Sequence, residues 1–262
     1  MVKRTISALI ALPLLFFVMF KGGDILYGSV LIVSLIGVWE YYHAFEQKEY
    51  KPLKKYGLLF ITLFFTFFRL GLSMEYLMFL CFSAVFIGMA IVTFYKKLNI
   101  VDFAITVSGI VYVAFFFFYI VLIKKYDSNF FIWYVFILAW ITDTSAYFAG
   151  VFFGKHKLIP EISPKKTVEG AVGGIIGATI VSVAYAYMFN PSFLYWSILL
   201  GIVGSVLSQI GDLIASGVKR YLGIKDYGNI MPGHGGVLDR FDSILITTPI
   251  VYYFMRIFLS CS

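Results

Sequence analysis

Most residues that could do chemistry are concentrated between Ser216 and Asp242, in a chain that is otherwise strongly apolar. The charged residues and the histidine of this stretch, SGVKRYLGIKDYGNIMPGHGGVLDRFD, are Lys219, Arg220, Lys225, Asp226, His234, Asp239, Arg240 and Asp242. Its PGHGG pentapeptide (232–236) has no bulky side chain except His234, so the backbone amides around Gly235 and Gly236 can approach an anion closely. Basic residues before this loop and carboxylates after it predict a site for a metal-bound polyphosphate.

The role of His234 has three alternatives, which are contact with phosphate, acid–base catalysis and capping of the loop. Zinc is not expected, because no second histidine lies at ligand spacing from His234. The two cysteines, Cys81 and Cys261, are too few and too dispersed for a disulfide framework or a metal site. We expect them to serve in packing.

Four carboxylates, Asp143, Asp212, Asp239 and Asp242, lie within apolar runs or at their edges. Charged side chains are costly inside a membrane, so they are functional candidates by default, although helix caps or partners of Lys and Arg are the alternative. Asp212 ends a stripe of small residues spaced for one helix face, and Asp239 and Asp242 share a face of the next helix. Close helix packing along such a stripe is expected to bring Asp212 and Asp239 together, and Mg²⁺ would relieve their repulsion.

A second glycine stripe, at residues 170–178, directly follows Lys165 and Lys166 in the segment ISPKKTVEG. Taken alone, such glycines are more typical of helix packing than of phosphate contacts. A helix N-terminus beside two lysines nevertheless favours an anion site, so both interpretations stay open.

The 262 residues are 61% hydrophobic and 13% charged, with a mean hydropathy of +0.90, which is typical of an integral membrane protein. No segment has the alternation of a membrane strand, so we predict an all-α, polytopic bundle forming one membrane domain, 1–262. Within it, 1–130 is expected to be mainly scaffold and 131–262 to carry the catalytic helices and loops. The nine predicted helices span 5–20, 25–45, 57–70, 75–95, 100–123, 130–153, 168–189, 193–215 and 239–259.

The distribution of basic residues predicts the orientation of these helices. With nine crossings, 16 of the 21 Lys and Arg residues fall on the side of the N-terminus, which is therefore expected to be cytoplasmic. The loop that ends at Asp242 would face the cytoplasm too. The net charge is +7, but the basic residues lie in connections between apolar runs and form no single patch, so no nucleic-acid partner is expected.

The order S-x-x-K-R-x4-K-D-x-G-x3-P-G-H-G-G-x2-D-R-x-D, from Ser216 to Asp242, resembles the C-terminal pattern of phosphatidate cytidylyltransferases, also called CDP-diacylglycerol synthases. Upstream, AYFAG after Asp143, GKHKL (154–158), ISPKKTVEG (162–170) and SQIGDL (208–213) also look like that family's segments, in the same order. The resemblance covers roughly the last 120 residues. One departure is Ala215, at a position that is often acidic in the family.

The resemblance implies that phosphatidate and CTP are converted to CDP-diacylglycerol and pyrophosphate, with Mg²⁺ as cofactor and a second cation as an open alternative. Asp212 and Asp239 would be the main metal ligands and Asp242 a further one, with Lys225 also assigned to catalysis. The residues expected to contact substrate are Asp143, Lys165, Lys166, Lys219, Arg220, His234, Gly235, Gly236 and Arg240. A multi-pass protein of the cytoplasmic membrane, in contact with membrane lipids and with a homodimer as one assembly, is the corresponding expectation.

Two other functions are weighed against this one. A CTP-dependent polyprenol or dolichol kinase would transfer the γ-phosphate to an alcohol and would need a base to deprotonate the hydroxyl group. An ion-coupled transporter would use intramembrane carboxylates to bind its ion. The two halves of this chain are dissimilar, whereas such transporters often carry matching repeats.

Overall fold

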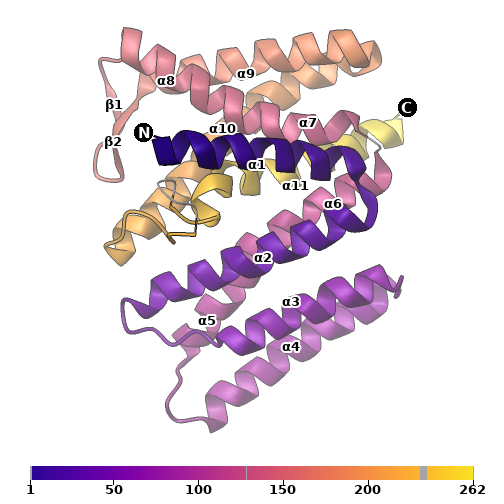
Figure 1. Ribbon diagram of the computed structural model, residues 1–262, viewed down its shortest axis with the longest axis vertical. Helices are drawn as coiled ribbons and strands as arrows, with labels where there is room; N and C mark the ends of the chain where they lie inside the picture. The colour runs from indigo at the N-terminus through magenta and orange to yellow at the C-terminus, as the bar shows by residue number, and fades with distance from the viewer. Residues whose placement is uncertain (1, 128, 231–234, 262) are drawn as a thin grey trace. The chain divides into compact units, whose positions relative to one another are not determined.

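The computed structural model describes residues 2–127, 129–230 and 235–261 (Figure 1). Within these ranges the chain forms nine continuous helical segments, which confirms the predicted all-α architecture. Their bounds are α1 (Val2–Lys21), α2 (Gly23–Glu46), α3 (Lys54–Arg69), α4 (Met74–Phe94), α5–η1–α6 (Ile100–Gly109, Ile110–Phe115, Phe116–Tyr126), α7–η2–α8 (Phe130–Phe136, Ile137–Ile141, Thr142–Phe153), α9 (Val168–Phe189), η3–α10 (Pro191–Phe193, Leu194–Leu222) and α11 (Leu238–Cys261).

In the part of the chain that the structure describes, seven of these segments are long and apolar enough to cross a membrane. Their mean hydropathy ranges from 1.4 to 2.5. The two shorter cases are α3, with 16 residues, and α1, whose apolar part is Ala11–Lys21. A spanning helix needs about 17 to 25 residues, so length and composition support a polytopic membrane protein.

The end of α10 differs from the prediction. The predicted helix stops at residue 215, where the apolar run gives way to SGVKRYL, but α10 continues to Leu222. It ends at Gly223, whose φ of 72° is left-handed and whose N–H donates to the carbonyls of Lys219 and Arg220. The polar residues continue the helix because they are acceptable helix formers, and the boundary at 215 was therefore wrong.

A short hairpin joins α8 to α9, in a connection for which the sequence predicts no strand. Its strands, β1 (Lys157–Ile159) and β2 (Ser163–Thr167), pair antiparallel with Lys157 opposite Thr167. Thr167 then caps α9, because its hydroxyl oxygen accepts from the N–H of Gly170 at 3.1 Å. The two lysines of ISPKKTVEG thus lie on a strand that leads directly into a helix.

The chain divides into two compact units. Unit 1 comprises Met1–Phe118 and Asp226–Asp239, and unit 2 comprises Tyr119–Lys225 and Arg240–Ser262. In unit 1, the buried ring of Tyr42 on α2 donates from its hydroxyl to the carbonyl of Thr106 at 2.6 Å. Gly57 and Gly109 border the same ring, and a Cβ at either position would collide with it.

In unit 2, the glycine stripes pack helices against one another. On α9, Gly173 and Gly177 lie against Ala149 and Ser145 of α8, and a Cβ at either glycine would overlap those side chains. On α10, a Cβ at Gly211 would lie 2.5 Å from Ile246 of α11. The packing interpretation of the stripe at 170–178 is therefore confirmed, and the helices that carry the polar residues of unit 2 are held at close range.

Candidate active site

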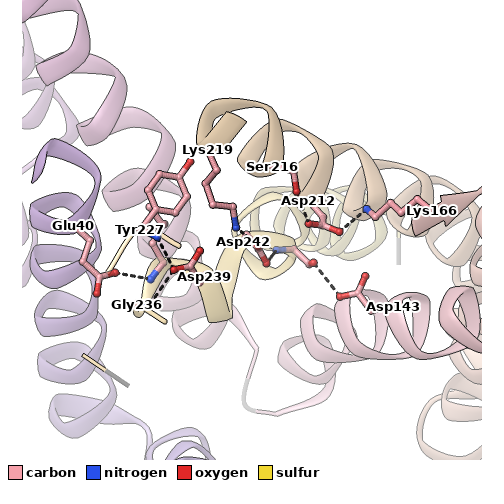
Figure 2. Close-up of polar contacts among 12 residues, drawn as sticks. Glu40, Asp143, Lys166, Asp212, Ser216, Lys219, Tyr227, Gly236, Asp239 and Asp242 are labelled. Carbon is pink, nitrogen blue, oxygen red and sulfur yellow. Dashed lines mark hydrogen bonds and ion pairs between the residues drawn. The ribbon is translucent and has the colours of Figure 1, made fainter. Parts of the chain in front are cut away.

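A polar cluster in unit 2 collects side chains from α8, β2, α10 and α11 (Figure 2). We call it the carboxylate–lysine cluster, and its members are Asp143, Lys166, Asp212, Ser216, Lys219, Asp242 and Ser243. Five of these seven residues are among the predicted site residues. Ser216 and Ser243 are the additions.

Lys166 of β2 forms an ion pair with Asp212 of α10. In β2, Lys166 is half-buried while Lys165 is exposed. The Lys166 and Asp212 side chains are 26% and 24% exposed. Nζ of Lys166 is itself buried, so the exposed part of this side chain is its aliphatic stem and the pair is largely shielded from water.

The extended α10 presents further members of the cluster on the face that carries Asp212. Ser216, four residues along, donates from its hydroxyl to Asp212 at 3.4 Å. Lys219, seven residues along, has its Nζ 3.8 Å from Oδ2 of Asp242 on α11, and these side chains are 13% and 17% exposed. The cluster thus contains a second lysine–carboxylate pair, better shielded than the first.

Asp143 joins the cluster through α11, because the hydroxyl of Ser243 donates to its Oδ2 at 3.1 Å. The backbone N–H of Ser243 also donates to Asp242 at 2.9 Å. Asp212 lies close enough to Asp143 and Asp242 for its negative charge to act on both. Three acidic groups and two lysines, carried by β2 and by closely packed helices, form a site that can bind cations and phosphates together.

Among the described residues, no three acidic, histidine or cysteine side chains are arranged to hold a metal ion. Mg²⁺ at nucleotide sites usually needs only one or two carboxylates, with phosphate and water oxygens completing its shell. Asp212 and Asp242 have the right chemistry for that role, so the cluster fits Mg²⁺ bound together with a polyphosphate. The predicted joint ligation by Asp212 and Asp239, which belong to different units, stays a prediction.

Asp239 is the second residue of α11 and belongs to unit 1. The buried Oδ2 of Asp239 accepts from the N–H of Tyr227 at 2.7 Å and of Gly236 at 3.0 Å (Figure 2). Gly235 has a φ of +84°, which favours glycine, and a Cβ there would lie 3.0 Å from the Asp239 carboxylate. In unit 1, both glycines thus organise the backbone around Asp239.

Glu40 of α2, which is not among the residues selected from the sequence, contacts the backbone next to Asp239 within unit 1. Its carboxylate is fully buried and accepts from the N–H groups of Val237 and Leu238. The signal was present, since Glu40 is a carboxylate inside an otherwise apolar predicted helix, the same criterion that selected Asp143.

The remaining predicted residues are not members of the carboxylate–lysine cluster, or lie outside the described residues. Lys165, Lys225 and Arg240 are exposed, and Arg220 donates from Nε to the carbonyl of Ile162 at 3.3 Å. His234 lies outside the described residues, as do Pro232 and Gly233. Their predicted substrate contacts stay predictions.

Comparison with known proteins identifies the family. The model of the cytidylyltransferase family matches residues 2–258, nearly the whole chain. The chain belongs to the cytidylyltransferase family. The resemblance inferred from the Ser216–Asp242 pattern is thereby confirmed, and the family match extends through the N-terminal half, where the sequence showed similarity only in hydropathy.

Three relatives within this family carry the name phosphatidate cytidylyltransferase. The protein of Staphylococcus haemolyticus is 41% identical over 157 residues and that of Staphylococcus aureus 42% identical over 160 residues; each match covers 60% of this chain and 60% of the relative. The protein of Staphylococcus epidermidis is 34% identical over 254 residues, which cover 95% of this chain and 96% of the relative.

Proposed function

We propose that this protein transfers a cytidylyl group from CTP to phosphatidate, giving CDP-diacylglycerol and pyrophosphate. The observation that carries the proposal is the carboxylate–lysine cluster, formed by membrane helices in a chain of the cytidylyltransferase family. The reaction joins two phosphate-bearing substrates, one of them a lipid. A site with lysines and carboxylates in a membrane protein supplies the charges that both substrates need.

In this reaction an oxygen of the lipid phosphate attacks the α-phosphorus of CTP. The bond between that phosphorus and the oxygen bridging to the β-phosphorus breaks, and its electron pair leaves with pyrophosphate. The lipid phosphate is largely ionised near neutral pH, so the attack requires no strong general base. Catalysis then depends mainly on positioning and on neutralising the phosphates.

Lys166 and Lys219 are proposed to neutralise these phosphates. Lys166 is paired with Asp212, and Lys219 with Asp242. Arrival of a polyphosphate gives each lysine a second anionic partner. Asp212 and Asp242 would hold Mg²⁺, which when bound neutralises developing phosphate charge and orients the triphosphate. Asp239, Lys225 and the exposed Lys165, Arg220 and Arg240 keep their predicted roles as parts of this proposal.

The proposed setting is the cytoplasmic membrane, with the cluster on the cytoplasmic side where CTP is available. The excess of Lys and Arg in the loops on the side of the N-terminus supports this orientation. The lipid substrate would enter from the bilayer that surrounds the helices. A homodimer is the proposed assembly, and the mass of the protein in a lipid nanodisc would test it.

The test uses purified protein with phosphatidate, Mg²⁺ and CTP labelled at the α-phosphate. Label in an organic-phase lipid, with one pyrophosphate released per lipid labelled, is the expected result. Label left in CDP would instead support the lipid kinase, because γ-phosphate transfer leaves the α-label on the nucleotide. Ion uptake into proteoliposomes that is independent of CTP, with no labelled lipid, would support the transporter.

A further inference from the structure

Glu40 caps a helix that lies far away in the sequence. It belongs to α2 (Figure 2) and is fully buried. Its carboxylate accepts from the backbone N–H of Val237 at 3.0 Å and of Leu238 at 2.8 Å, at the start of α11. The first N–H groups of any helix lack intrahelical partners. Val237, the residue before α11, has no side-chain acceptor, so a local cap of the usual Ser, Thr, Asp or Asn type is missing.

The backbone around the Glu40 carboxylate is shaped to admit it. A Cβ at Gly228 would lie 2.5 Å from Oε1 of Glu40, and a Cβ at Gly236 would lie 2.5 Å from Oε2. Next to Glu40 on α2, the ring of Tyr41 packs against that of Tyr227, with 6.3 Å between ring centroids. Helix α2 therefore contacts residues 227–228 and residues 236–238.

Backbone amides next to those that bind Glu40 also bind the Asp239 carboxylate. Tyr227 and Gly236 donate their N–H groups to Asp239, while Val237 and Leu238 donate theirs to Glu40. The two carboxylates repel each other, and these four amides offset that repulsion. Burying a carboxylate carries a desolvation penalty that an apolar side chain of similar size would not have, so packing alone does not explain Glu40.

We infer that Glu40 is a positioning residue: its carboxylate holds the described residues 227–230 and 235–238 of unit 1 in the arrangement that presents Asp239. This inference deepens the proposed cytidylyl transfer and rests on it. Glu40 acts through backbone amides and touches no substrate. Within unit 1, α2 thereby has a part in positioning Asp239.

The test compares Glu40→Gln with the wild type in the full-length protein in nanodiscs, by amide hydrogen exchange and by α-labelled CTP transfer. Glutamine keeps the shape but has one acceptor oxygen and no charge, so at least one amide loses its partner. We expect exchange in the peptide 226–239 to rise about tenfold or more, as for loss of a charge-assisted hydrogen bond, with α9 unchanged. We expect kcat to fall by a similar factor, with a smaller change in KM for CTP.

The matched control is Glu46→Gln, the same substitution on the same helix at a side chain that is 39% exposed. It should leave both the exchange of 226–239 and the transfer rate at wild-type values. Coupling gives a second measurement, because Gly228→Ala should disturb the Glu40 carboxylate directly. The double variant Gly228→Ala with Glu40→Ala should then raise the exchange of 226–239, in logarithmic terms, by less than the sum of the increases in the two single variants.

Unchanged exchange in Glu40→Gln, or unchanged transfer in a variant whose exchange has risen, would overturn the inference. A wild-type protein without transfer activity would contradict the proposed function separately. In that case the exchange result still decides whether Glu40 holds the segment. A general loss of fold in Glu40→Gln would show as faster exchange in α9 as well. The Gly228→Ala variant, which keeps the carboxylate, would then be used: faster exchange in 226–239 with α9 unchanged would support the positioning role of Glu40, and unchanged exchange in 226–239 would contradict it.

Discussion

Lys166 and Asp212 form an ion pair that joins the strand β2 to the helix α10, each side chain being about one quarter exposed. The pair places a cation and an anion from segments 46 residues apart at one point of the carboxylate–lysine cluster. Its partial shielding from water reduces screening by salt but adds a desolvation penalty, so loss of either partner leaves a poorly solvated charge.

Lys166→Met should lower kcat/KM for CTP by roughly 10²-fold, since it removes a phosphate partner and leaves Asp212 without its cation. Steady-state kinetics with α-labelled CTP measures the effect. Lys157→Met, an exposed lysine of β1, is the control and should retain wild-type kinetics. Wild-type kinetics in Lys166→Met would remove this lysine from the site.

Ser243→Ala should lower kcat/KM about tenfold, because the Asp143 carboxylate loses a hydrogen bond made at 3.1 Å. The control is Ser260→Ala on the same helix, whose exposed hydroxyl donates only to the carbonyl of Ile257 among the contacts of the described chain. Equal rates in the two variants would show that the bond between Ser243 and Asp143 has no part in turnover.

Chelation of divalent cations should stop turnover, and added Mg²⁺ should restore it. The Mg²⁺ concentration for half-maximal rate should rise at least tenfold in Asp242→Asn, because a neutral amide is a weaker ligand for a hard cation. Titration of the transfer rate with Mg²⁺ checks both statements. Full activity in excess EDTA would contradict the metal role.

Asp239→Asn should abolish measurable turnover while leaving a folded membrane protein. The substitution removes the charge that accepts the N–H groups of Tyr227 and Gly236, and with it the predicted metal ligand. Transfer kinetics and size-exclusion chromatography in detergent are the paired measurements. Near-normal turnover would rule out Asp239 as a catalytic residue.

Gly211→Ala should destabilise the protein by about 1–3 kcal/mol, because the added methyl group would lie 2.5 Å from Ile246 of α11. Gly28→Ala on α2 is the matched control. Its Cβ meets nothing within 4 Å, so it should be neutral or slightly stabilising through helix propensity. Thermal unfolding of the two variants in the same detergent decides between these outcomes.

Much of the fold follows from local patterns in the sequence. Apolar runs of membrane length separated by charges produce helices whatever their neighbours, so all nine helical segments could be predicted. The boundary at residue 215 was missed because hydropathy marks where a helix leaves the membrane, whereas the backbone stops at a left-handed glycine, here Gly223.

The sequence predicted individual residues of the candidate site but not the contacts between them. Residue type and the family pattern selected Lys166, Asp212, Lys219 and Asp242, since charges in or beside apolar helices are rarely accidental. Which lysine pairs with which carboxylate was decided by tertiary structure, because β2, α10 and α11 meet only when the glycine stripes pack.

Glu40 marks the limit of what the sequence by itself determined. Spacing along one helix relates residues three or four apart, whereas Glu40 and Leu238 are separated by 198 positions. No local pattern encodes such a contact. Only the folded chain places a buried carboxylate of α2 against the uncapped amides of α11, where burial makes each of those hydrogen bonds necessary.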